Sequence, residues 1–148
     1  MLRLAKLTDY AIVVLAHLAR EAHVCVHPAS AIAEATGVPQ PTVAKVLKSL
    51  TREGLVLSSR GVTGGYSLAR DPARISVVDV IAAVEGPLAL TACAVEGLGC
   101  TDEHHCQVAG HWPRINGAVI DALRAVSILD LSRPDPRALS LPPALARS

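Results

Sequence analysis

Residues 91–112 interrupt an otherwise helix-forming chain with a segment rich in thiol and imidazole groups. It holds three of the four cysteines in the spacing Cys-x₆-Cys-x₅-Cys, namely Cys93, Cys100 and Cys106. It also holds three of the six histidines, namely His104, His105 and His111. The segment has no hydrophobic periodicity, so a packed helix or strand is a poor explanation for it. Because thiolates and imidazoles bind soft and borderline metals, we interpret it as a metal-binding loop.

The composition of the 148-residue chain predicts one domain, or a small domain with an oligomerisation element. Hydrophobic residues make up 51% of the chain but aromatic residues only 2%, which favours an aliphatic, helical core. No apolar run reaches the roughly 18 residues of a membrane span, and the start does not resemble a signal peptide. We therefore expect a cytoplasmic protein, in which clustered cysteines bind metal or react with oxidants more often than they form disulfides.

The charged residues are unevenly distributed, although the net charge is only +1. Residues 38–70 carry five Lys or Arg and one Glu. Residues 75–113 carry five Asp or Glu and no Lys or Arg. The first region is suited to face phosphates, and the second to offset a bound cation or to stay away from DNA.

The first half of the chain contains three helix patterns. Apolar residues at spacings of three and four predict an amphipathic helix over residues 4–20, with Thr8 and Asp9 on its polar side. Further helices are predicted over residues 29–36, where a glycine follows, and over residues 41–53, where a proline suits the first turn. Two helices joined by a glycine-containing turn, the second with a polar and basic face, form a helix-turn-helix pattern.

A glycine-rich hairpin is predicted next. Residues 55–58 and 66–68 are strand candidates, and the seven residues between them include Arg60 and three glycines. This is the pattern of a wing, whose small residues let the backbone approach a phosphate and whose arginine can enter a minor groove. A fourth helix is predicted over residues 76–85, with Ser76 as its N-cap in a variant capping box.

A heptad pattern follows the cysteine segment. Apolar residues at alternating spacings of three and four predict one helix over residues 111–131, and its narrow seam favours packing against a second copy. The seam residues are Trp112, Ile115, Val119, Ala122, Val126 and Leu129. Residues 132–148 contain four prolines and are predicted to be a disordered tail. The expected organisation is a DNA-binding domain over 1–86, a cluster-binding loop over 87–110, and then this helix and tail.

In this order the segments resemble the IscR/NsrR/SufR-like winged-helix transcription regulators, which sense iron–sulfur cluster status, nitric oxide or redox. The resemblance rests on the opening MLRLAKLTDYA, the turn and helix GVPQPTVAKVLKSLTREGLV, the wing RGVTGGYSLA, the segment ISVVDVIAAVEGP, and the three-cysteine loop followed by a tryptophan. The opening is most similar to the subgroup that regulates the SUF cluster-assembly operon.

The resemblance implies a mainly α fold: a winged helix-turn-helix domain with a two-stranded wing plus a long C-terminal dimerisation helix. It also implies a homodimer that binds a palindromic operator in double-stranded DNA. The third helix would enter the major groove and the wing the minor groove. The candidate DNA-binding residues are Gln40, Thr42, Lys45, Lys48 and Arg60.

The resemblance further implies an iron–sulfur cluster on Cys93, Cys100 and Cys106, with 2Fe–2S favoured and 4Fe–4S open. Many members place a histidine three residues after the last cysteine, but this sequence has Ala109 there. Other members use a carboxylate from the first helix of the partner chain, and Asp9 matches that position. Asp9 is the favoured fourth ligand. The rivals are His104, His105 and His111.

The predicted function is a homodimeric DNA-binding regulator that senses cluster or redox status and represses SUF-type assembly genes. The alternatives are a winged-helix regulator with a structural zinc, and a small cluster-carrier or electron-transfer protein. Each site also has a plainer interpretation: loop thiols without a metal, a solvated basic helix face, and an Asp9 that only favours the helix N-terminus. An enzyme is not predicted, because the sequence has no phosphate-cradling loop, nucleophile elbow or suitably paired carboxylates.

Overall fold

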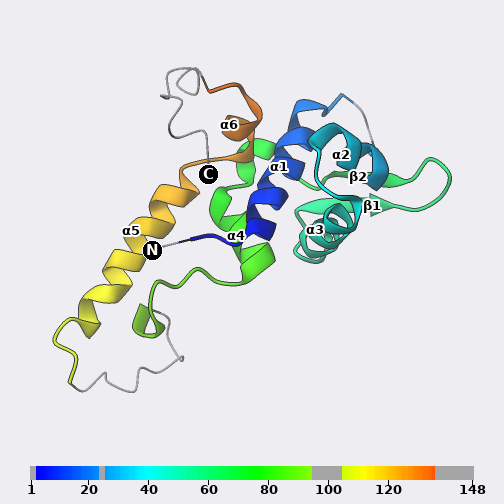
Figure 1. The fold of residues 1–148 in the computed structure, drawn as a ribbon. Helices are drawn as coiled ribbons and strands as arrows, with labels where there is room; N and C mark the ends of the chain where they lie inside the picture. Colours follow the sequence, from blue (N-terminus) through cyan, green and yellow to red (C-terminus); the bar gives the residue numbers. More distant parts are fainter. Residues whose placement is uncertain (1–2, 24–25, 95–104, 136–148) are drawn as a thin grey trace, which may run out of the picture.

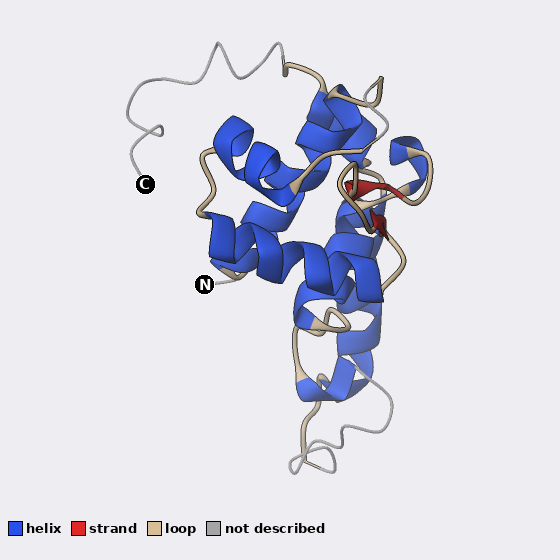
Figure 2. Cartoon of the chain, turned by 90° about the vertical axis from the view of Figure 1, so that its right-hand side faces the viewer, coloured by secondary structure: helices blue, strands red, loops and turns tan. Residues whose placement is uncertain are grey.

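The computed structural model describes residues 3–23, 26–94 and 105–135, which form a mainly helical protein with one two-stranded antiparallel sheet (Figures 1 and 2). The helices are α1 (Lys6–Arg20), α2 (Ala29–Thr36), α3 (Gln40–Arg52), α4 (Val77–Glu85), α5 (Trp112–Arg124) and α6 (Ile128–Ser132). The strands are β1 (Val56–Ser59) and β2 (Gly65–Leu68). Short 3₁₀ turns are η1 (Pro72–Arg74), η2 (Ala92–Ala94) and η3 (Ala109–His111). The predicted mainly α, winged fold class is confirmed.

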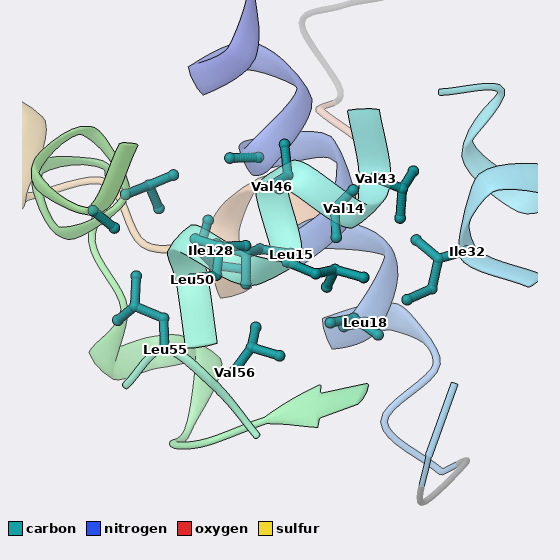
Figure 3. Close-up of a cluster of buried hydrophobic side chains, with 14 of the residues drawn as sticks. Val14, Leu15, Leu18, Ile32, Val43, Val46, Leu50, Leu55, Val56 and Ile128 are labelled. Carbon is teal, nitrogen blue, oxygen red and sulfur yellow. The ribbon is translucent and has the colours of Figure 1, made fainter. Parts of the chain in front are cut away.

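An aliphatic core lies where α1 crosses α3 and is closed by α2, α4, α6 and the start of β1 (Figure 3). The side chains of Leu15, Leu50 and Ile128 are fully buried at its centre. Burying each such side chain contributes about 1.5–3 kcal/mol, so this contact holds the helix-turn-helix against the rest of the domain. Within the described residues, no helix is long and apolar enough to cross a membrane.

The predicted signals at helix ends are found in the structure. Gly37 ends α2 in the left-handed conformation at φ 70°, which favours glycine. Ser76 caps α4: its hydroxyl accepts from the Asp79 N–H, and the Asp79 carboxylate accepts from the Ser76 N–H. The capping box expected from the sequence is therefore present.

The start of α1 differs from the prediction. The helix begins at Lys6, and Thr8, expected on its polar side, is fully buried. No side chain of α1 caps its N-terminus. Instead Glu85, at the end of α4, accepts from the Ala5 N–H at 2.9 Å and from the Thr8 hydroxyl. A carboxylate at a helix N-terminus also suits the helix dipole. The N-terminus of α1 is therefore capped by a residue of α4 that lies 80 positions away from Ala5 in the chain.

The wing hairpin is joined to the segment before α2. Val56 pairs with Leu68 and Ser59 with Gly65, and Tyr66 exchanges two backbone hydrogen bonds of 2.8 Å with His27. A Cβ at Gly65 would lie 2.5 Å from the His27 carbonyl oxygen, and one at Gly64 would lie 2.3 Å from that of Ser59. Both positions therefore require glycine because a side chain would collide with the backbone of the wing or of the segment at His27. This requirement does not depend on a phosphate or any other ligand.

The single helix predicted over residues 111–131 is wrong, because two helices occupy this stretch. Helix α5 ends at Arg124, and α6 starts at Ile128 after Ser127, which forms a second capping box with Asp130. The Val77 N–H donates to the Val126 carbonyl at 3.0 Å, and the Ile128 N–H donates to the Ile75 carbonyl at 2.8 Å.

This break has a physical reason. It turns Ile128 into the core and places α6 against α1, whereas a continuous α5 would carry Ile128 away from the domain. Val126 and Leu129 therefore leave the predicted seam. Ser132, expected to begin the tail, is buried at the end of α6, and residues 136–148 lie outside the described residues.

Candidate DNA interface and candidate metal centre

Helix α3 presents a basic face on the outside of the domain. Its apolar side is buried through Val43, Val46, Leu47 and Leu50. Gln40, Lys45 and Lys48 are exposed, and Thr42 is half-buried. These four predicted DNA-binding residues thus share the helix that follows the Gly37 turn, as the recognition helix of a helix-turn-helix does.

The wing carries the fifth candidate, Arg60, directly after β1. Arg60 is exposed, and the neighbouring Val62 is fully exposed at the hairpin tip. The only acidic residue between positions 38 and 70 is Glu53, whose carboxylate pairs with the Arg52 guanidinium at 3.0 Å. None of Lys45, Lys48 and Arg60 forms an ion pair within the part of the chain that the structure describes. Their charges are therefore open to a polyanion.

Two of the three predicted cysteine ligands are described, and both are half-buried free cysteines. Cys93 lies in η2, is half-buried, and its sulfur is 3.4 Å from the Thr91 hydroxyl as a hydrogen-bond partner. Cys106 is a half-buried free thiol shortly before η3. Cys93 thus lies on a turn that contacts α5, and Cys106 lies just before the turn η3 that leads into α5. Cys100 and His104 lie outside the described residues.

Asn116 of α5 holds the chain that leads to Cys93. It is only 5% exposed; its side-chain oxygen accepts from the Leu90 N–H at 3.1 Å, and its side-chain nitrogen donates to the Leu88 carbonyl at 3.2 Å. Sequence reasoning missed Asn116, although a lone asparagine inside an amphipathic helix is a signal that its side chain has a specific partner.

We expect Asn116→Ala to loosen the segment before Cys93, because it leaves the Leu90 N–H and the Leu88 carbonyl unpaired. The free energy of unfolding should fall by about 1–3 kcal/mol, measured by chemical denaturation. Amide exchange at Leu90 should also accelerate. Gln107→Ala, which truncates an exposed amide in the same region, is the control. Unchanged exchange at Leu90 in Asn116→Ala would contradict this role for the Asn116 amide.

The three candidate fourth ligands that the structure describes are exposed and lie on different segments. Asp9 lies in the first turn of α1, His105 lies in a turn, and His111 closes η3. Among the residues the structure describes, no three His, Cys, Asp or Glu side chains converge on a metal-sized site. The choice between Asp9 and the histidines therefore stays a prediction.

The contact between Glu85 and Thr8 lies between the two candidate sites. Glu85 ends α4, immediately before the segment that leads to Cys93, while Thr8 adjoins Asp9. Helix α1 in turn packs on α3. Sequence reasoning did not find this contact, because nothing in the local sequence indicates that α1 is capped from α4.

A second polar contact joins α1 to the segment before α2, which pairs with the wing. The rings of His17 and His27 meet edge to face with centroids 5.5 Å apart, and His27 is 8% exposed. Burial lowers the pKa of His17, and the neighbouring His27 lowers it further. Both effects favour the uncharged form of His17, which suits a place beside the core.

A helix-turn-helix with an exposed basic face, followed by a short β-hairpin wing, defines a DNA-binding protein of the winged-helix class. The chain belongs to the Rrf2 family of iron-dependent transcriptional regulators, whose pattern matches residues 4–134.

Relatives in this family agree with the class. An HTH-type transcriptional regulator of Aquifex aeolicus is 31% identical over 82% of this chain and 85% of its own length. The HTH-type transcriptional regulator IscR of Xenorhabdus nematophila is 29% identical over 88% of this chain and 79% of its own.

Solved structures share the fold. CymR, the global cysteine regulator of B. subtilis, superimposes with a TM-score of 0.69 at 27% identity, over 89% of this chain and 97% of CymR. IscR of T. potens gives 0.69 at 23% identity, over 98% and 96%. The protein is thus a transcriptional regulator and not an enzyme.

Proposed function

We propose that this protein is a homodimeric regulator whose DNA binding depends on an iron–sulfur cluster held by Cys93, Cys100 and Cys106. The observation that carries the proposal is the placement of Cys93 and Cys106, two free and half-buried cysteines on either side of Cys100 in the chain, the first in η2, which contacts α5, and the second shortly before η3, which leads into α5. The family is described as iron-dependent, which supports iron as the metal.

The donor set fits such a group. Thiolates are the usual ligands of iron–sulfur clusters, and a hydrogen bond to a ligating sulfur tunes the reduction potential. The Thr91 hydroxyl is in place to make that contact with Cys93. When bound, the cluster would supply a redox-active, labile centre. The three cysteines would hold it, and the partner subunit's Asp9 is our proposed fourth ligand, with His104, His105 and His111 as alternatives.

The chain offers a route from the loop to the DNA-binding face. Asn116 fixes Leu88 and Leu90 to α5, and Glu85, just before them, caps α1 through Ala5 and Thr8. A change in the cysteine loop can thus pull on the start of α1, which packs on α3. Coupling between two sites is typically 1–3 kcal/mol, enough to change DNA affinity about 5- to 150-fold.

The exposed apolar face of α5 is the proposed dimer contact. Ile115 is 43% exposed, and with Val119 and Ala122 it keeps the heptad spacing within the helix. A dimer suits a palindromic operator, because two recognition helices then meet two half-sites. We further propose 2Fe–2S over 4Fe–4S, a cytoplasmic location, and SUF-type cluster-assembly genes as repressed targets.

An anaerobic visible spectrum, with iron and acid-labile sulfide counts and DNA affinity measured on the same sample, tests the proposal. We expect bound iron and sulfide, absorbance between about 320 and 460 nm, and a DNA affinity that changes when the cluster is removed. A colourless protein that takes up no iron on anaerobic reconstitution but contains zinc would contradict the sensor function. The protein would then be a winged-helix regulator with a structural metal.

A further inference from the structure

A hollow of about 380 Å³ lies between the recognition helix and the wing, and its lining includes one lysine and three hydroxyl-bearing residues. The lining residues are Ala44, Lys48, Thr51, Ser58 and Tyr66. The first three lie at positions i, i+4 and i+7 of α3, which places them on one face of the helix. That face flanks the buried stripe and turns toward β1, which α3 contacts.

The hairpin supplies the opposite wall. Ser58 of β1 and Tyr66 of β2 are directly paired in the antiparallel register, so their side chains stand next to each other on one face of the sheet. Ser67 faces the other way, since strand side chains alternate, and it lines a different hollow. Strand pairing thereby places Ser58 and Tyr66 side by side, and both line the hollow together with Lys48.

The chemistry of this wall suits an anion. No carboxylate lines the hollow, and the nearby Glu53 is already paired with Arg52. Ala44 has only a methyl group, which leaves room beside Lys48. Hydroxyl donors around one ammonium group bind a phosphate better than a neutral or cationic ligand.

We propose that this hollow seats one phosphate of the DNA backbone, with Lys48, Ser58 and Tyr66 as its ligands. The proposal rests on the DNA-binding function above and adds two contacts to it, because Ser58 and Tyr66 were not among the predicted DNA-binding residues. A phosphate held at the junction of α3 and the wing would fix how deeply the helix enters the major groove while Arg60 reaches along the minor groove. Such contacts fix position rather than read sequence.

The test compares hydroxyl deletions that keep the fold. Tyr66→Phe and Ser58→Ala should each weaken binding about 10-fold, equally for operator-like and unrelated duplexes, since a hydrogen bond to a charged group is lost. Lys48→Gln should weaken binding and reduce the slope of log affinity against log salt by about 1. The hydroxyl variants should leave that slope unchanged. Fluorescence anisotropy on a short labelled duplex measures all of these.

Matched controls are Tyr10→Phe on α1 and Ser67→Ala on the opposite face of the hairpin, both expected to bind as wild type. If Tyr66→Phe and Ser58→Ala bind every duplex as tightly as wild type, the phosphate seat is wrong while DNA binding stands. The seat is also wrong if inorganic phosphate at constant ionic strength perturbs the Ser58 and Tyr66 amides but a duplex does not, since the hollow would then take a free phosphate. A wild-type chain that binds no duplex would instead overturn the function itself.

Discussion

Replacing Cys93, Cys100 or Cys106 with alanine is expected to abolish bound iron and sulfide, together with the visible absorbance, after anaerobic reconstitution. Three thiolates are the proposed cysteine ligands of the cluster. The two thiolates that remain in each variant are not expected to retain the cluster. Cys93 and Cys106 are only half-buried, so their truncation should leave the far-ultraviolet circular dichroism and the unfolding midpoint close to those of wild type. The measurement is iron and sulfide per chain, made beside the spectrum.

The matched control is Cys25→Ala, which removes a cysteine outside the proposed set and should keep the full iron content. An iron content in Cys106→Ala equal to that of wild type would contradict the ligand assignment. Loss of iron in Cys25→Ala as well would mean that the cysteines act through folding. If the wild-type protein binds zinc instead of iron and the same three variants lose that zinc, the ligand assignment would be correct but the iron–sulfur sensor function would be wrong.

Asp9→Ala in the same series addresses the fourth ligand. A shifted spectrum at unchanged secondary structure is expected if Asp9 coordinates, because the first turn of α1 is already capped by Glu85 and does not need the Asp9 carboxylate for that purpose. An unchanged spectrum, with a shift in His105→Ala or His111→Ala, would move the assignment to the histidine concerned. Mixed dimers of Asp9→Ala and Cys106→Ala chains would then report whether the ligand crosses the dimer.

The helix-turn-helix and the wing could be predicted because their signals are local. Gly37 with its positive φ, the proline in the first turn of α3, and the Ser76–Asp79 box each act within four residues, and the structure contains all of them. The wing was predicted as well, but for an incomplete reason: Gly64 and Gly65 are required by backbone contacts with Ser59 and His27.

The C-terminal helix was mispredicted because a seven-residue hydrophobic repeat was given more weight than a capping signal. Ser127 and Asp130 have the same spacing as Ser76 and Asp79, and the same reciprocal hydrogen bonds follow in the structure. The Asp130 carboxylate accepts from the Ser127 hydroxyl at 2.6 Å and from the Ser127 N–H at 2.9 Å, and these two hydrogen bonds, the first more than the second, lower the pKa of Asp130. The Ser-x-x-Asp signal was present in the sequence, and it correctly places a helix start at Ile128.

Contacts distant in the chain were out of reach of sequence reasoning. Nothing near Thr8 indicates that Glu85 will accept its hydroxyl hydrogen, and nothing near Leu90 indicates Asn116. These contacts arise only once α1, α4 and α5 have packed, and they connect the cysteine loop to the helix-turn-helix. The same dependence on assembly applies to the fourth ligand, whose proposed source is a second chain.

Val119→Asp is expected to convert a dimer into a monomer and to weaken binding to a palindromic duplex by at least ~100-fold, because linking two half-site contacts raises avidity by that order. Val119 lies at the centre of the apolar face of α5, which Ile115, Ala122 and Leu123 continue. Ile115 and Ala122 are exposed in the single chain and Val119 is half-buried, while α5 also contacts α4 and η2. An aspartate there costs the single chain little, but in a dimer it would be buried without a partner.

Sedimentation equilibrium gives the mass, and anisotropy on duplexes with one or two half-sites gives the affinities. Gly117→Asp is the control, since it adds the same charge to α5 at a position that is outside the apolar face and where a new Cβ would meet no atom within 4 Å. This variant should remain dimeric. A Val119→Asp protein that stays dimeric would place the interface elsewhere. One that becomes monomeric yet keeps its affinity for the two-site duplex would mean that each chain binds DNA independently. The shortened α5 makes this test sharper, because Val126 and Leu129 are no longer available to extend the seam.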